Sequence, residues 1–155
     1  MLKPFEVIGA GRPEFEMGVD APAFDWGEKA TFENPSDATV KQAVLGIFAG
    51  LPDEVLPILT KVAMELVRNA QAYAAPTPSA IRTHASVYTL ILGWTMDGGY
   101  RYPLIMVGDR NPAMPVVRES TRTGLKRVIG DTYRCGAAGT QSGKWVWGLV
   151  DPQKR

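Results

Sequence analysis

Two stretches in the first half of the chain place hydrophobic residues three or four positions apart, which is the spacing of one helical face. The first begins after Ser36 or Asp37, short polar residues of the kind that cap helices, and ends near Gly50. The second begins at Pro52, with acidic residues in its first turn, and ends before Pro76. The pattern predicts two consecutive amphipathic helices.

The next stretch carries two overlapping patterns. Thr77-Pro78-Ser79 is typical of a helix start, and apolar residues over 78–93 share one helical face. Residues 88–96 also alternate, and 97–107 fit a glycine turn followed by a return strand. Pro103 weakens this hairpin, because proline cannot donate to a strand ladder. We therefore favour a helix to about Gly93 and keep the hairpin as the alternative.

The last third of the chain mixes polar loops with short apolar segments. Apolar positions over 116–129 support a further helix, softened at Gly124, and the small residues of 136–143 predict a linker. Alternating apolar residues over 144–150 predict a closing strand. The elements together predict a mainly α fold with a small β component and a core of about four helices. An α+β fold is the alternative.

Residues 1–35 show no sustained period and predict an extended N-terminal arm. A mostly helical core over 36–135 and a C-terminal linker and tail over 136–155 follow it. The arm carries aromatic residues, which disordered tails usually lack. These candidate assembly residues are Phe5, Phe15, Phe24, Trp26 and Phe32. Such an arm packs either on its own domain or on a neighbouring subunit, and the pattern leaves both open.

Composition narrows the classes of protein. A chain of 155 residues and 16.9 kDa predicts a single folded unit that needs no disulfide. The single cysteine, Cys135, and the single histidine, His84, exclude an internal disulfide and any site that needs two histidines. No apolar run is long enough to span a membrane, and the first residues lack the apolar segment of a signal peptide. We expect a reducing, cytoplasm-like compartment.

Charge is unevenly distributed although the net charge is only +1. Residues 1–37 carry eight acidic and three basic side chains, whereas residues 101–155 carry ten basic and four acidic ones. An acidic front and a basic back fit either a nucleic-acid surface or subunits that pack front to back.

A row of basic residues lies on one face of the predicted helix over 116–129. Arg118, Arg122 and Lys126 are four positions apart, and Arg127 and Arg134 continue the row. Such a row can follow a phosphate backbone, where each neutralised phosphate releases counterions. A solvated helix face produces the same pattern. These residues are the candidate nucleic-acid contacts.

No catalytic constellation stands out. His84 has Ser86 and Asp97 within reach in the sequence, but nothing marks a nucleophile. The glycines of 136–143 precede Lys144 without the spacing of a phosphate-binding loop. We therefore predict a protein that is not an enzyme and that uses no cofactor or metal.

Residues 50–55 read Gly-Leu-Pro-Asp-Glu-Val, and residues 61–70 read Lys-Val-Ala-Met-Glu-Leu-Val-Arg-Asn-Ala. They resemble a helix in the potexvirus-like coat proteins of flexuous filamentous plant RNA viruses. Residues 94–99 with 102–104 are similar to a segment of potyvirus-type coats. The resemblance covers residues 35–105. The chain is shorter than those coats and lacks both their later aromatic-aspartate motif and their long C-terminal arm.

The resemblance implies a mostly helical subunit with exchanged arms and RNA held in a groove. A serine, an arginine and an aspartate line that groove in the family. Ser79 and Arg118 match the first two, and no residue matches the aspartate.

The resulting expectation is a virion structural protein, such as a capsid protein. It polymerises through its N-terminal arm and can bind single-stranded RNA along its basic face, in the virion or the host cytoplasm. The alternative is a small soluble binding or inhibitor protein without catalysis. Its binding surface is the arm together with the strand that carries Trp145 and Trp147.

Overall fold

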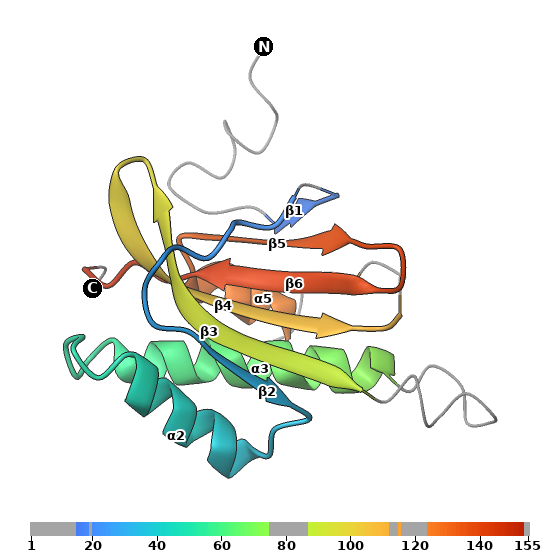
Figure 1. Cartoon of the computed structure of the whole chain (residues 1–155), viewed down its shortest axis with the longest axis horizontal. Helices are drawn as coiled ribbons and strands as arrows, with labels where there is room; N and C mark the ends of the chain where they lie inside the picture. Colours follow the sequence, from blue (N-terminus) through green and yellow to red (C-terminus); the bar gives the residue numbers. More distant parts are fainter. Residues whose placement is uncertain (1–14, 19, 75–86, 112–114, 116–123, 154–155) are drawn as a thin grey trace.

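The computed structural model describes residues 15–18, 20–74, 87–111, 115 and 124–153. Within them, six strands form one mixed sheet in the order β1-β5-β6-β4-β3-β2, with three helices on one face (Figure 1). The strands are β1 (Phe15–Met17), β2 (Ala30–Glu33), β3 (Tyr88–Asp97), β4 (Tyr100–Asp109), β5 (Arg134–Gly139) and β6 (Lys144–Leu149). The helices are α2 (Asp37–Ile47), α3 (Leu56–Ala74) and α5 (Leu125–Asp131). All neighbouring strands are antiparallel except β1 and β5, which are parallel.

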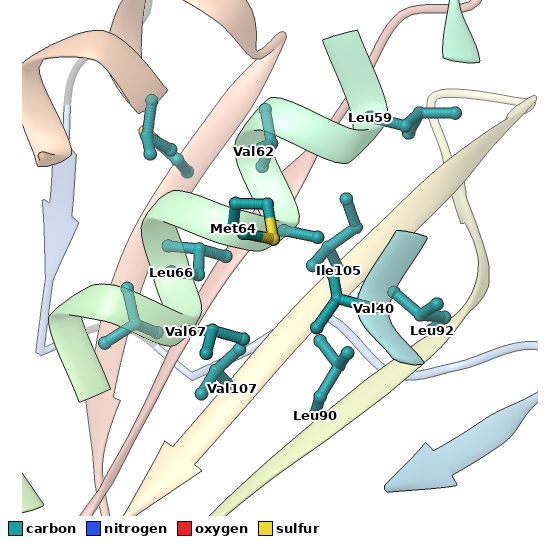
Figure 2. Close-up of a cluster of buried hydrophobic side chains, with 14 of the residues drawn as sticks. Val40, Leu59, Val62, Met64, Leu66, Val67, Leu90, Leu92, Ile105 and Val107 are labelled. Atoms are coloured by element: carbon teal, nitrogen blue, oxygen red, sulfur yellow. The ribbon is translucent and has the colours of Figure 1, made fainter. Parts of the chain in front are cut away.

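The main hydrophobic core lies between the sheet and the helices. Helix α3 presents one apolar face to β3 and β4, and α2 packs beside it (Figure 2). The fully buried side chains of this core include Val40, Leu59, Leu66, Leu90, Leu92 and Ile105. Burying a side chain of this size contributes about 1.5–3 kcal/mol, so this layer is a main source of stability.

A smaller core covers the opposite face of the sheet. Strands β1 and β2 lie at the two edges, although only residues 18–29 separate them in sequence. The chain between them therefore crosses the face that carries no helix (Figure 1). Residues 20–29, here called the strap, contribute Ala21 and Phe24 to this core. The buried sheet residues beneath are Tyr102, Leu104, Met106, Trp147 and Leu149.

Aromatic rings lie close to glycines on this second face. A Cβ atom on Gly93 would come within 2.6 Å of the Phe24 ring, and one on Gly108 within 2.6 Å of the Trp145 ring. Such distances are shorter than van der Waals contact, so the missing side chains are what allow the rings to approach the sheet. Gly93 of β3 is thus part of the packing of the strap, and Gly108 of β4 makes room for the Trp145 ring of β6.

The prediction of a mainly α fold is wrong, because the sheet is the larger part of the structure. Residues 88–107, favoured as a helix to Gly93, form the β3–β4 hairpin at the centre of the sheet instead. Both faces of these strands are apolar, and such a run cannot be told from a buried helix by periodicity alone. Residues 136–143, expected to be a linker, hold most of β5.

Pro103 is accommodated because of where β6 ends. Its carbonyl accepts a hydrogen bond from the Val150 backbone N–H at 3.2 Å. The N–H and C=O of one strand residue point to the same side. The missing N–H of Pro103 therefore faces the end of the β6 ladder, whose pairing with β4 begins at Leu104. The hairpin keeps its hydrogen bonds to β3.

The two helices predicted in the first half of the chain are confirmed, but the second begins at Leu56 and not at Pro52, so Asp53 and Glu54 lie in the turn before α3. Ser36 caps α2, and its hydroxyl accepts from the Thr39 backbone N–H at 3.2 Å. The further helix predicted over 116–129 is described only from Leu125 onward. Gly124, with φ at +73°, is the residue that begins α5, and its N–H donates to the buried carboxylate of Glu65 at 2.9 Å.

We expect Gly93→Ala to lower the free energy of unfolding by about 1–3 kcal/mol, because the added methyl group meets the Phe24 ring. In a Phe24→Ala background the same change should cost less than half as much, since the obstructing ring is gone. Urea denaturation of the four proteins measures this coupling. Equal costs in both backgrounds would show that Phe24 does not pack on Gly93.

Candidate interaction site

The β3–β4 hairpin ends in a tight turn that rises away from the helices (Figure 1). Asp97 pairs with Tyr100 across the turn, and the two residues between them, Gly98 and Gly99, have φ values of +59° and +86°. Consecutive positive φ angles match the twist of a two-residue hairpin and favour glycine. The turn therefore fixes the direction in which the neighbouring side chains project.

Arg101 lies next to this turn and joins the hairpin to the strap. Its Nε donates to Asp25 Oδ2 at 2.8 Å, and its Nη2 donates to Asp25 Oδ1 at 3.3 Å. The guanidinium also lies 4.9 Å from the ring centre of Trp26 and 4.6 Å from that of Trp94. A cation between two indole rings is held by both ring quadrupoles as well as by the carboxylate.

The electrostatics of this pair follow from the geometry. The hydrogen bond from Arg101 is the largest influence on the Asp25 carboxyl, and it lowers the pKa of Asp25 below its usual value. The same hydrogen bond is the main cause that raises the pKa of Arg101. Both groups are therefore charged at neutral pH.

Arg134 makes a second link of the same type at the start of β5. It binds Glu16 with two hydrogen bonds, from Nε at 2.9 Å and from Nη2 at 2.7 Å, and reaches Asp97 at 3.3 Å. Its guanidinium lies 5.4 Å from the Trp147 ring centre. The bond to Glu16 is the main cause that raises the pKa of Arg134. One side chain thus joins β1, β5 and the hairpin turn.

Large apolar side chains are exposed around this end of the hairpin. Trp26 is 87% exposed and Tyr100 is 71% exposed, while Met96 lies opposite Arg101 in the strand register. On the other face of the hairpin, exposed Tyr133 stacks on Tyr102 with ring centres 4.8 Å apart. Met96 and Trp26 lie on the Arg101 side of the hairpin, whereas Tyr100, which pairs with Asp97, lies on the Tyr102 side with Tyr133. The hairpin-tip surface comprises Trp26, Met96, Tyr100 and Tyr133 and extends over both sides of the tip.

A cleft of about 460 Å³ opens beside this surface, between the strap and the hairpin. Its walls are Asp20, Pro22, Ala23, Asp25, Thr95, Met96 and Arg134. The Thr95 hydroxyl donates to the Ala23 carbonyl at 2.7 Å, and the Asp25 N–H donates to the Trp94 carbonyl at 2.7 Å. These bonds hold the strap against β3, so the cleft is a fixed part of the fold.

A second polar feature lies at the opposite end of the sheet. Lys144 Nζ donates to Asp109 Oδ1 at 3.0 Å and to the Asn111 carbonyl at 2.9 Å. Both side chains are fully buried, and Asp109 Oδ2 is buried without a hydrogen-bond partner. A pocket of about 190 Å³ adjoins the pair. The arrangement joins β4 to β6, because each ion compensates the buried charge of the other.

The structure brings together few of the residues predicted to contact nucleic acid. Ser79, Arg118 and Arg122 lie outside the described residues. Lys126 and Arg127 lie on α5, where both are half-buried, and Arg127 forms an ion pair with Asp131 at 3.6 Å. Whether a basic row follows a phosphate backbone stays a prediction.

The predicted assembly residues divide into two groups. Phe15 and Phe32 pack against the main core from β1 and β2, and Phe24 packs on the second face. Phe5 lies outside the described residues. Trp26 alone among the four described residues of this set projects into solvent. The described part of the arm therefore packs on its own domain, which is one of the two arrangements that the sequence left open.

The sequence alone did not point to Arg101, and it suggested Arg134 only as part of the basic row and Asp97 only as a neighbour of His84. The one sequence feature that pointed to this region was the Asp97-Gly98-Gly99 turn, which the hairpin alternative required. The partners Glu16 and Asp25 lie more than 70 positions from their arginines. No local sequence pattern could have shown that these residues pair with each other.

Among the described residues, no group of three or more histidine, cysteine or acidic side chains is arranged to hold a metal ion. The described helices include none that is both long and apolar enough to cross a membrane. His84 lies outside the described residues, and Cys135 is buried in β5. Comparisons of the chain with family models, with characterised proteins and with solved structures find no match.

We expect Asp25→Asn to destabilise the protein more at pH 7 than at pH 2.5. The lowered pKa of Asp25 means that its carboxylate stabilises the fold above the unfolded-state pKa, near 4, and that this contribution is lost as pH falls through the folded-state pKa. Urea denaturation across this range measures the difference between the two proteins. Exposed Asp53→Asn is the control, and a gap for Asp25→Asn that is constant with pH would contradict the assignment.

We expect Lys144→Met to lower the free energy of unfolding by about 3–5 kcal/mol, because it leaves the Asp109 carboxylate buried without a countercharge. Adding Asp109→Asn should restore part of that loss, since a neutral amide is easier to bury. Thermal and urea unfolding of both variants provide the test. A double variant no more stable than Lys144→Met would show that the buried charge is not the cause.

Proposed function

We propose that the chain is a non-catalytic structural subunit that assembles with copies of itself through the hairpin-tip surface, as virion coat subunits assemble. The observation that carries the proposal is Trp26, an indole exposed to 87% yet fixed in place by Arg101 and Asp25. Large exposed apolar side chains in one region are typical of protein contact sites.

The composition of the surface supports a protein contact. Tryptophan, tyrosine, methionine and arginine are the residue types enriched at the centres of interfaces. Here they are Trp26, Tyr100, Met96 and Arg101. The ion pair and the ring stacking order the Arg101 and Trp26 side chains before any partner binds. That order lowers the entropy lost on association.

The charge distribution supports a contact between unlike faces of two copies. The strap lies in the acidic first part of the chain, and the basic excess lies in residues 101–155. When two copies meet through two different faces, each pair still carries one free face of each kind, to which further copies can bind. Such heterologous contacts produce rings when they close and filaments when they do not.

The same surface would serve a small binding protein that recognises a different partner. The strand named for that alternative has its Trp147 fully buried and Trp145 packed on Gly108. Only the half-buried Trp145 keeps accessible surface, so the hairpin tip offers this alternative more exposed aromatic area than that strand does. Self-association is what distinguishes the two functions.

We expect the purified full-length protein to form oligomers or polymers, and Trp26→Ala with Tyr100→Ala to raise the dissociation constant about 30-fold or more, as loss of interface hot spots does. Light scattering after size-exclusion chromatography and negative-stain microscopy measure assembly. Leu45→Ala is the matched control, because Leu45 is 52% exposed on α2, away from the hairpin.

Two results would contradict the proposal. A wild-type protein that stays monomeric at high concentration would favour the binding-protein alternative. Assembly that Leu45→Ala weakens as much as the double variant would show that the hairpin-tip surface is not the specific contact. Circular dichroism of each variant confirms that the fold is retained.

A further inference from the structure

We propose that β1 and the strap form a releasable cover, which leaves the second face of the sheet as one unit while the sheet and the helices stay folded. Two carboxylate–arginine pairs hold this cover closed, so that acid opens it. The strap crosses the face that carries no helix, and β1 lies at the sheet edge where that crossing begins (Figure 1). The inference goes beyond the proposed function and does not depend on self-assembly.

The two pairs share one arrangement, in which the cover carries the carboxylate and the sheet carries the arginine. Glu16 on β1 accepts two hydrogen bonds from Arg134 on β5, at 2.9 and 2.7 Å. Asp25 on the strap accepts two from Arg101 on β4, at 2.8 and 3.3 Å. Charge-assisted bonds made in pairs are strong and directional. Protonation of the carboxylates therefore weakens the cover at two points at once.

Both arginines have contacts with the sheet that do not involve the cover. Arg134 lies 5.4 Å from the Trp147 ring centre and also binds Asp97, at 3.3 Å. Arg101 lies 4.6 Å from the Trp94 ring centre. A guanidinium is attracted to the face of an indole ring whether or not a carboxylate is present. The arginines can therefore stay on the sheet when the cover leaves.

The cover contributes little to the main core. No described residue of the cover is buried, since each is half-buried or exposed. The buried residues of the main core come from Val40 onward, and Phe15 packs against them only as a partly buried side chain. Segments with few buried apolar contacts open at a lower free energy than the whole domain needs to unfold. Opening of the cover therefore leaves the layer between the sheet and the helices in place.

Opening uncovers a group of apolar side chains on β4 and β6. Phe24 of the strap packs on this cluster, whose members become accessible when the strap leaves. They are Tyr102, Leu104, Met106, Trp147 and Leu149. A contiguous apolar patch of this kind on a protein surface is typical of a contact site. The cover thus controls access to an apolar surface beside Arg134.

The electrostatics of the cover give the direction of its response to pH. The hydrogen bond from Arg101 holds the pKa of Asp25 below its usual value. This attachment is therefore complete above the pKa of the released carboxyl, near 4, and is lost as pH falls through the pKa of the closed state. The other charged groups on the strap or beside the two pairs are Asp20, Glu28, Lys29 and Asp97.

Two backbone hydrogen bonds report whether the cover is closed. The Gly18 N–H donates to the Ala137 carbonyl at 3.0 Å, and the Asp25 N–H donates to the Trp94 carbonyl at 2.7 Å. Such N–H groups exchange with solvent hydrogen when their segment opens, and the strand ladder of β3 and β4 exchanges only when the sheet itself opens. The two rates distinguish release of the cover from unfolding.

The test is hydrogen exchange of the full-length protein, measured by mass spectrometry at a concentration where it is monomeric. We expect Glu16→Gln with Asp25→Asn to speed exchange at Gly18 and position 25 about 10- to 100-fold at pH 7, because each half-exposed pair contributes about 3- to 10-fold. The β3–β4 ladder should change less than about 3-fold. At pH 3, after correction for intrinsic rates, the cover of the wild-type protein should exchange as fast as that of the variant.

A matched control and a second measurement keep the proposal open to refutation. Glu28→Gln removes an exposed carboxylate from the same strap and should leave exchange of the cover unchanged. The dye 1-anilinonaphthalene-8-sulfonate, which binds exposed apolar surface, should bind the double variant at pH 7 without loss of the helical circular dichroism signal. An equal effect of Glu28→Gln, equal acceleration of the β3–β4 ladder, or dye binding only together with loss of helix would each overturn the proposal.

Discussion

The structure depends on covering both faces of its central strands. Leu104 and Leu149 on β4 and β6 face away from the helices, while Ile105 and Val146 face toward them, and all four are buried. A sheet with two apolar faces is stable in water only when both are covered. The helices cover one face, so the chain must supply a second layer. The strap is that layer, and its path from one sheet edge to the other follows from this requirement.

Covering the second face with an extended segment has a consequence for the surface. A strap of ten residues is too thin to bury all of its own side chains. Phe24 packs on the sheet, whereas Trp26 lies where the chain bends and is exposed. Asp25 lies between them and holds Arg101. The exposed indole is therefore a product of the strap's geometry, and the residues that position it also hold the strap on the sheet.

The sequence indicated α2 and α3 because each has an apolar stripe at helical spacing, although α3 begins at Leu56, after the acidic residues taken as its first turn. It failed at the β3–β4 hairpin, where residues 88–96 alternate as a strand does but residues 78–93 also share one helical face, and the helix start at Thr77-Pro78-Ser79 and the proline at 103 favoured the helix. The contacts of Arg101 with Trp26 and Trp94 could not be predicted from the sequence for another reason. These residues approach only after the strap has crossed the sheet, and tertiary contacts between distant residues leave no local period.

In the proposed assembly, stability and interaction are therefore linked, but not at every residue. Changing Asp25 or Arg101 releases the strap as well as altering the tip, so a loss of binding there has two causes. Trp26 differs, because most of its ring contacts solvent and its removal leaves the bond between Asp25 and Arg101 in place. Trp26 is therefore the residue of this group whose removal affects the fold least. Its exposure costs hydrophobic free energy that burial against a partner recovers.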